Sequence, residues 1–305
     1  SYSEILQRIR KIDPIRYGTT RNYINGAVSY LSPYISRGVI STKFIFSELL
    51  NRGYHPNMIE KFIQELAWRD YWQQIWTAKG DAINHDLKHK QYPVSNHSIS
   101  TAINRGETGI HAIDTAIKEF YKTGYIHNHL RMYIASITCN IGQNHWKIPA
   151  KWMYYHLLDA DWASNALSWQ WVAGTNANKK YIVNQDNINK YCFTNQKTTF
   201  LDISYEELAR IETPDILKET SLIKLKTPLP KQQSIDFNEK VPTLLYNFYN
   251  LDPNWKKGIV ANRILLLEPS IFFNYPIAQK TIEFMISLSQ KNIPNVQLFV
   301  GEFHE

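Results

Sequence analysis

The strongest constraint on the fold is a helical spacing of apolar residues that persists through most of the first 200 residues. Apolar side chains recur at three- and four-residue intervals, the period that places them on one face of an α-helix. Turn sequences containing glycine separate the successive segments. The spacing predicts helices over residues 41–50, 58–79, 109–122, 128–140 and 149–158. We therefore expect a large all-helical domain over residues 1–200, without strands.

The pattern changes after residue 200. Residues 201–258 are rich in Lys, Glu and Pro and predict a linker with short helices. Two compact apolar runs, 263–268 and 296–300, flank a helical segment at 276–290. Strand, helix and strand at this spacing predict a parallel βαβ unit. The prediction is a mainly α chain ending in a small α/β unit over residues 259–305, too short for a complete doubly wound sheet.

The composition narrows the function classes. The chain has 305 residues, of which 44% are hydrophobic and 20% charged, as in an ordinary globular protein. A net charge of +7 favours a polyanionic partner. The aromatic content of 13% fits core packing, base stacking or a bound aromatic cofactor, and composition leaves these three open.

The sequence does not indicate a membrane protein, a secreted protein or a metalloprotein. No apolar run reaches the roughly 18 residues of a membrane-spanning helix, and the N-terminus has no secretory signal. The two cysteines lack metal-binding spacing and indicate a reducing compartment. We expect a cytoplasmic protein without a membrane segment or a metal site; the sequence does not indicate its oligomeric state.

Residues 159–171, reading DADWASNALSWQW, combine acids, an amide and tryptophans in one short segment. Acids beside aromatic rings suit a pocket that holds a polar, redox-active ring. In the helix at 58–79, Glu65, Trp68 and Arg69 share one face with Trp72 and Trp76. That face predicts an aromatic-lined, hydrated cavity in preference to a purely apolar core.

Two further patterns are weaker. Ser29, Ser32 and Ser36 precede helical sequence, where hydroxyl and backbone N–H groups can hold a phosphate, although Ser-Pro is also ordinary capping sequence. His127 and His129 are two residues apart and would face different directions on a helix. A structural or DNA-contacting role suits these histidines better than metal binding.

Four of these motifs together resemble a known family. YGTTRNY…SYLSPYISRGVIS, FIQELAWRDYW, TGYIHNHLRMYIAS and DADWASNALSWQWVAGT occur in the order found in the FAD-binding domain of photolyases and cryptochromes. The resemblance covers residues 1–192. In the family an α/β antenna domain usually precedes this domain; we expect no counterpart of it here and no antenna site in the C-terminal unit.

The resemblance implies an all-helical domain that holds FAD in a bent form. Asn165 matches the position facing flavin N5, where an amide is typical of photolyases and an acid of plant cryptochromes. The implied cofactor contacts are Tyr17, Ser29, Leu31, Ser32, Phe62, Glu65, Arg69, Arg131, Asp159, Asp161 and Asn165.

The resemblance also implies a DNA-facing site. Glu65, Asn128 and Met132 match positions that touch a flipped pyrimidine dimer, and Trp68 and Trp171 match the rings that sandwich it. Extruding a damaged dinucleotide costs a few kcal/mol, which stacking on aromatic rings offsets. The implied activity is that of a deoxyribodipyrimidine photo-lyase, a carbon–carbon lyase in which light-excited reduced flavin donates an electron to the dimer in DNA.

Some positions depart from the family pattern. Trp169 and Trp146 match the first two members of the tryptophan chain that photoreduces flavin, whereas the third position has no Trp and Tyr92 is the nearest substitute. His129 stands where photolyases of cyclobutane dimers usually carry Arg. Two alternative functions follow from these departures: a blue-light photoreceptor of cryptochrome type, and a non-catalytic FAD-binding interaction protein.

Overall fold

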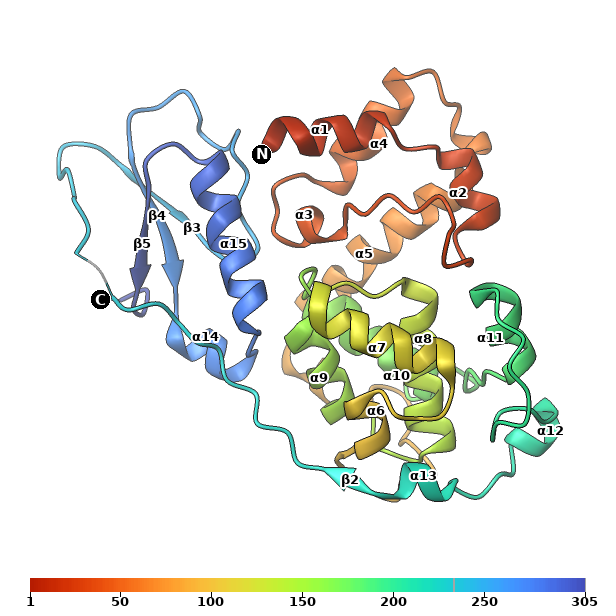
Figure 1. Cartoon of the computed structure of the whole chain (residues 1–305). Helices are drawn as coiled ribbons and strands as arrows, with labels where there is room; N and C mark the ends of the chain where they lie inside the picture. Colours follow the sequence, from red (N-terminus) through yellow and green to blue (C-terminus); the bar gives the residue numbers. More distant parts are fainter. Residues whose placement is uncertain (233, 305) are drawn as a thin grey trace.

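The computed structural model describes residues 1–232 and 234–304. Figure 1 shows a large helical part and, beside it, a small α/β unit formed by the end of the chain. The mainly α fold predicted from the sequence is confirmed. No helix in the described ranges has the length and apolarity needed to cross a membrane.

The helical part is built from short and medium helices joined by tight turns. Its α-helices are α1 (Tyr2–Arg10), α2 (Pro14–Thr20), α3 (Ser32–Ser36), α4 (Thr42–Asn51), α5 (Glu60–Lys79), α6 (Thr101–Arg105), α7 (His111–Thr123), α8 (Asn128–Ser136), α9 (Lys147–His156), α10 (Trp162–Ala173) and α11 (Gln185–Cys192). Two 3₁₀-helices, η1 (Pro56–Met58) and η2 (Gly80–Asn84), flank α5, and the π-helix η3 (Ile137–Ile141) extends α8.

Helix α10 lies at the centre of this part, packed against α5, α8 and α9. Asp161 caps its N-terminus by accepting a hydrogen bond from the backbone of Ser164, and Gly174 ends it with a φ of 83°. Buried residues lie on all its faces, as expected for a helix enclosed by others. Segment 159–171 is therefore mostly interior, and only its end reaches the surface.

The segment predicted as a linker begins with two short helices, α12 (Tyr205–Leu208) and α13 (Asp215–Lys218). It then forms β2 (Thr220–Ser221), which pairs antiparallel with β1 (Ile99–Ser100). This two-residue pairing corrects the prediction of a helical domain without strands. Such short strands leave no periodic signal, because only contact between distant segments creates them.

The α/β unit contains a three-stranded parallel sheet in the order β3 (Thr243–Tyr246), β4 (Asn262–Leu267) and β5 (Val296–Val300). Helices α14 (Pro269–Asn274) and α15 (Gln279–Asn292) connect β4 to β5, as the βαβ pattern predicted. Strand β3 lies within the segment predicted as a linker, so the sheet has one more strand than the sequence indicated. Helix α15 lies between the sheet and the helical part (Figure 1).

Candidate functional site

Two buried carboxylates occupy the loop between α9 and α10, residues 157–161, here called the acidic loop. Asp159 is 5% exposed and Asp161 is 2% exposed. Charges removed from water to this extent are stable in a fold only when other groups pair with them. The neighbours of the two acids therefore define the site.

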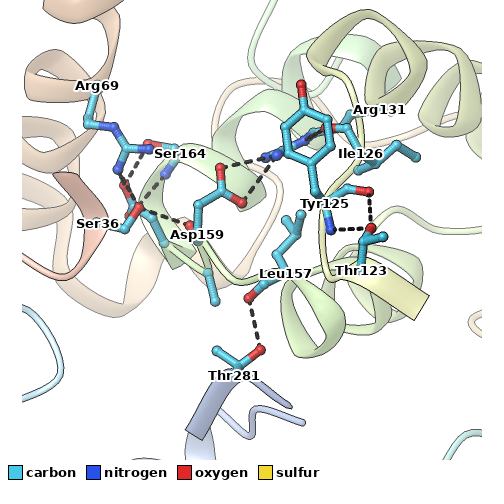
Figure 2. Close-up of polar contacts among 12 residues, drawn as sticks. Ser36, Arg69, Thr123, Tyr125, Ile126, Arg131, Leu157, Asp159, Ser164 and Thr281 are labelled. Atoms are coloured by element: carbon cyan, nitrogen blue, oxygen red, sulfur yellow. Dashed lines mark hydrogen bonds and ion pairs between the residues drawn. The ribbon is translucent and has the colours of Figure 1, made fainter. Parts of the chain in front are cut away.

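Arg131 on α8 pairs with Asp159. Its Nη2 lies 3.1 Å from each carboxylate oxygen of Asp159, and its Nε donates to the carbonyl of Ile126 at 3.0 Å. Figure 2 shows the guanidinium held between these partners. The second bond fixes the orientation of the guanidinium. Within the described residues, Arg131 bonds through Nε and Nη2 and not through Nη1.

Arg69 on α5 pairs with Asp161. Its Nη1 donates to Asp161 Oδ2 at 2.9 Å and to Ser36 Oγ at 2.8 Å. Asp161 also accepts hydrogen bonds from Gln73 at 2.6 Å and from the hydroxyl of Ser164 at 2.7 Å. Ser36 in turn donates to the backbone carbonyl of Asp159 at 3.0 Å, so the two ion pairs belong to one network (Figure 2).

The electrostatics of this network keep Asp159 ionised. Burial alone raises the pKa of Asp159, but Arg131, Arg69 and a hydrogen bond from Ser32 outweigh it, so the pKa falls below its ordinary value. The contact with Ser32 brings the start of α3 to the acidic loop. A negative charge is thus present at neutral pH beside two guanidinium groups.

The other predicted cofactor residues surround this network in different ways. Tyr17 packs its ring edge-on against Phe62 with centroids 4.9 Å apart, and Leu31 is buried beside α3. Ser29 lies half-buried in the loop before α3. Asn165 is buried on α10 and donates from Nδ2 to the carbonyl of Ala150 at 2.8 Å, which fixes the orientation of its amide.

The five residues predicted to face DNA are Glu65, Trp68, Asn128, Met132 and Trp171, here called the outer group. They are more exposed than the acids: Trp68 is 50% exposed and Trp171 is 41% exposed. The side chain of Glu65 is 38% exposed and meets Arg21 at 3.4 Å. Asn128 is exposed at the start of α8, and Met132 packs partly against the core.

The structure does not bring the two predicted sandwich rings into contact with each other. Trp68 stacks on Trp72 with centroids 5.2 Å apart, whereas Trp171 lies 5.8 Å from Tyr181. No ring contact joins Trp68 to Trp171 among residues 1–232 and 234–304. The two rings therefore belong to separate clusters, on α5 and at the end of α10.

The two histidines near the outer group are neutral. Burial lowers the pKa of each to about 4, helped by Arg131 at His127 and by His127 and Arg21 at His129. His129 stacks on Tyr191 with centroids 4.7 Å apart. The buried Nε2 atoms of both histidines have no partner in the described part of the protein, and a buried polar atom of this kind is usually satisfied by water or a ligand.

The tryptophans of the predicted electron-transfer chain are fully interior. Trp146 and Trp169 are buried, and Trp146 donates from Nε1 to Asp86 at 2.7 Å. No ring contact links Trp146 to Trp169 within the described ranges. Tyr92, the nearest substitute for the third tryptophan, is 81% exposed.

Sequence reasoning missed several partners in the site. Gln73 lies one turn after Arg69 on the same face of α5, so its spacing could have identified it. Arg21 stands inside the YGTTRNY motif and Arg37 directly follows Ser36. Their partners lie far away in the chain, and no local pattern points to them.

The chemistry of the site fits a dinucleotide cofactor. Arg69 binds its protein partners through Nη1 alone, so Nε and Nη2 remain available for a phosphate in the part of the chain described. The ionised Asp159 can accept hydrogen bonds from sugar hydroxyl or ring N–H groups. No cluster of His, Cys, Asp and Glu suited to a metal ion occurs among the described residues.

Comparison with known proteins shows what this arrangement is similar to. Residues 62–242 match the family model of the FAD binding domain of DNA photolyase. A deoxyribodipyrimidine photo-lyase of Alkalihalophilus pseudofirmus is 33% identical over 155 residues, covering 49% of this chain and 32% of the relative. A cryptochrome DASH of Synechocystis sp. is 30% identical over 169 residues, covering 52% of this chain and 34% of the relative. The chain spans about a third of the length of these curated relatives.

A solved structure shares the fold. The crystal structure of a cryptochrome from Synechocystis sp. aligns with a TM-score of 0.56 and 24% identity, over 63% of this chain and 43% of that chain. At this identity the likeness concerns the fold alone.

Proposed function

The chain belongs to the family of the FAD binding domain of DNA photolyase, and from this premise we propose that it is a FAD-dependent, light-driven DNA repair enzyme. The predicted family and its cofactor, FAD, are confirmed by the match over residues 62–242. The proposed substrate is DNA that carries a cyclobutane pyrimidine dimer. The proposed activity is that of a deoxyribodipyrimidine photo-lyase.

In this proposal the acidic loop and its arginines bind the cofactor. Asp159 and Asp161 accept hydrogen bonds from hydroxyl and ring N–H groups, while Arg69 and Arg131 contribute positive charge and free N–H donors. Asn165 presents a neutral amide that cannot lose a proton. Bound FAD supplies the light absorption and the electron transfer that no side chain can provide.

The observation that carries the repair proposal is the arrangement of α5. Arg69 points from this helix to the buried Asp161, and Glu65, one turn earlier, is 38% exposed and held by a single 3.4 Å contact with Arg21. One rigid helix thus connects the cofactor-binding network to a carboxylate that a substrate can reach. Glu65 is suited to accept hydrogen bonds from a flipped base and to orient it.

Trp68 and Trp171 complete the proposed substrate site. Exposed indole rings stabilise unstacked bases by about 1–3 kcal/mol per base. Trp68 lies one turn from Glu65 and is backed by Trp72, so its ring is held in place before a base arrives. Asn128 offers an exposed amide at the start of α8 for polar contact with the base.

A direct assay tests this function. The purified protein, loaded with FAD and chemically reduced, is mixed with an oligonucleotide containing a thymine dimer and illuminated with near-ultraviolet or blue light. We expect loss of the dimer in the light and none in the dark. Glu65→Gln should keep FAD and lose repair, whereas Glu60→Gln, an exposed control on the same helix, should keep both. Persistence of the dimer in illuminated, FAD-loaded protein would overturn the proposal.

The second candidate function is blue-light sensing without repair. One specific observation favours it: the C-terminal α/β unit contacts the acidic loop through Thr281, so a change at the cofactor has a direct route to a second unit. Limited proteolysis in light and darkness distinguishes the two functions. Light-dependent cleavage without dimer repair would favour the sensor.

A further inference from the structure

The α/β unit reaches the acidic loop through α15. Thr281, fully buried in the first turn of this helix, donates from Oγ1 to the carbonyl of Leu157 at 3.1 Å (Figure 2). The backbone N–H of Ala278 donates to the carbonyl of Tyr155 at 2.8 Å. Both bonds hold the chain directly before Asp159.

A second contact holds the same loop at Ala160. Arg37, with no exposed surface, donates from Nη2 to the carbonyl of Ala160, the residue between the two acids. Its guanidinium carbon lies 3.4 Å from the ring centroid of Phe248, in the turn after β3. Burial lowers the pKa of Arg37 to about 10, so the group remains charged at neutral pH.

The α/β unit covers the buried guanidinium of Arg37. Its Nε and Nη1 have no hydrogen-bond partner among the described residues. A buried guanidinium is stabilised by an aromatic face, and Phe248 supplies that face. Without the turn at residues 247–251, this cation would lose the aromatic group that covers it.

The backbone of this turn also fits α3 closely. The N–H of Leu251 donates to the carbonyl of Arg37 at 2.9 Å. Gly38 has a φ of +64°, and a Cβ added there would lie 2.1 Å from the carbonyl oxygen of Tyr249. Only glycine permits both this conformation and this approach.

We propose that the C-terminal α/β unit is a clamp that positions the acidic loop for FAD. The positioning residues are Thr281 of the unit and Arg37 of the helical part, which Phe248 of the unit covers. The two residues hold the carbonyls of Leu157 and Ala160, on either side of Asp159. The clamp rests on the proposed role of Asp159 and Asp161 in binding FAD. It assigns the α/β unit a function in cofactor affinity, distinct from light harvesting.

The clamp can be tested because FAD binding and docking of the α/β unit are thermodynamically linked. If docking of the unit favours the loop geometry that binds FAD, FAD must favour docking by the same factor. Amide hydrogen exchange at Leu251 and Ala278 should therefore slow when FAD is added to the apo-protein. Both amides bond across the interface and lie outside the proposed cofactor contacts.

A matched pair of variants tests the positioning role. Thr281→Val removes the bond to the acidic loop, and Thr138→Val removes an equally buried hydroxyl that donates to the carbonyl of Ile134 at 2.7 Å. Each should lower the melting temperature to a similar extent. Thr281→Val should weaken FAD binding about fivefold, the effect of one typical hydrogen bond, and Thr138→Val less than about twofold. The measurement is a fluorescence titration of apo-protein with FAD.

A second pair of variants distinguishes weaker FAD binding from a folding defect. Arg37→Lys keeps the charge, and Phe248→Leu keeps an apolar side chain but removes the aromatic face; each should weaken FAD binding while the protein stays folded by circular dichroism. Equal FAD affinity in Thr281→Val and Thr138→Val, or unchanged exchange at Leu251 and Ala278 on FAD addition, would overturn the clamp.

One further variant separates this failure from failure of the cofactor site. If Asp159→Asn loses FAD while Thr281→Val keeps it, the clamp alone is wrong. If Asp159→Asn keeps FAD, the site assignment and the clamp are both wrong. These experiments measure FAD binding and not DNA repair. The clamp can therefore be tested even if the protein does not repair DNA.

Discussion

The arginine partners of the acidic loop lie on the same helices, α5 and α8, as most of the outer group, but the acids and the outer group differ in how fully their side chains are paired. Asp161 alone accepts hydrogen bonds from Arg69, Gln73 and Ser164, and it is 2% exposed. Glu65 has one contact at 3.4 Å and is 38% exposed. A fully paired, buried network is organised before its ligand binds, whereas an exposed carboxylate with a single partner can exchange that partner for a substrate. The difference suits a permanent cofactor on one side and a transient substrate on the other.

The largest expected effect comes from breaking the buried side. Arg131→Met leaves the carboxylate of Asp159 without its main partner, and an unpaired buried charge costs about 3–5 kcal/mol. We expect lower stability in urea unfolding and loss of FAD during purification. Arg105→Met, at an exposed arginine on α6, is the control and should change neither. Retention of FAD and of stability by Arg131→Met would contradict the role assigned to the network.

A smaller loss is expected at Asn165. Asn165→Asp places a carboxylate oxygen against the carbonyl of Ala150 in a buried position and should cost about 1–3 kcal/mol. The cost should grow as pH rises, because burial opposes ionisation of the new acid. Chemical denaturation at several pH values measures it, with the exposed Asn128→Asp as the control. We also expect a changed visible spectrum of the illuminated protein; an unchanged spectrum would remove Asn165 from the position next to the reactive ring.

Substitutions in the outer group should change DNA affinity and leave stability and FAD content unchanged. Trp68→Ala removes an exposed ring, so stability and FAD content should stay near those of the parent protein. Affinity for dimer-containing DNA in the dark should fall by about 1–3 kcal/mol, the contribution of one stacked base. Fluorescence anisotropy measures this affinity, and Phe273→Ala, at an 85% exposed ring on α14, is the control. Loss of FAD in Trp68→Ala would contradict the assignment of the outer group to substrate binding and of the acidic loop to cofactor binding.

A further expected effect concerns the pH dependence of stability. Burial lowers the pKa of His129 from 6.5 to about 4, so the unfolded chain binds a proton at this residue before the folded protein does. The free energy of unfolding should therefore fall as pH decreases from about 6.5 towards about 4. His129→Phe keeps a ring against Tyr191 and should reduce this pH dependence. Equal slopes in the parent and the variant would show that His129 does not titrate in this way.

Much of the fold could be predicted because helical spacing is a local property. The long segments at 58–79 and 109–122 correspond to α5 and α7 with ends that differ by no more than two residues. The predicted helix at 128–140 is two elements in the structure: α8 ends at Ser136, and the π-helix η3 follows it. Strand β3 escaped prediction because a run of four residues, Thr243–Tyr246, carries little periodic signal. Its parallel pairing with β4 makes it a strand.

The candidate site divides in the same way. The motifs identified Arg69, Arg131, Asp159 and Asp161, since each lies in a segment whose residue types and spacing resemble the family. They did not indicate that Arg69 would share Ser36 with the backbone of Asp159. That bridge joins residues of three separate elements, and its existence depends on how α3, α5 and the acidic loop pack.

The order of the helices follows from short spacings in the chain, and the family and the residue types of the candidate site follow from four motifs that resemble it. The position of the α/β unit does not. Thr281 lies 124 residues from Leu157, and Arg37 meets Phe248 across most of the chain. Such contacts form when complete helices and strands pack together. A local sequence pattern is compatible with many packing arrangements and does not distinguish between them. For this reason the acids are visible in the sequence, whereas the clamp that holds them appears only in the folded molecule.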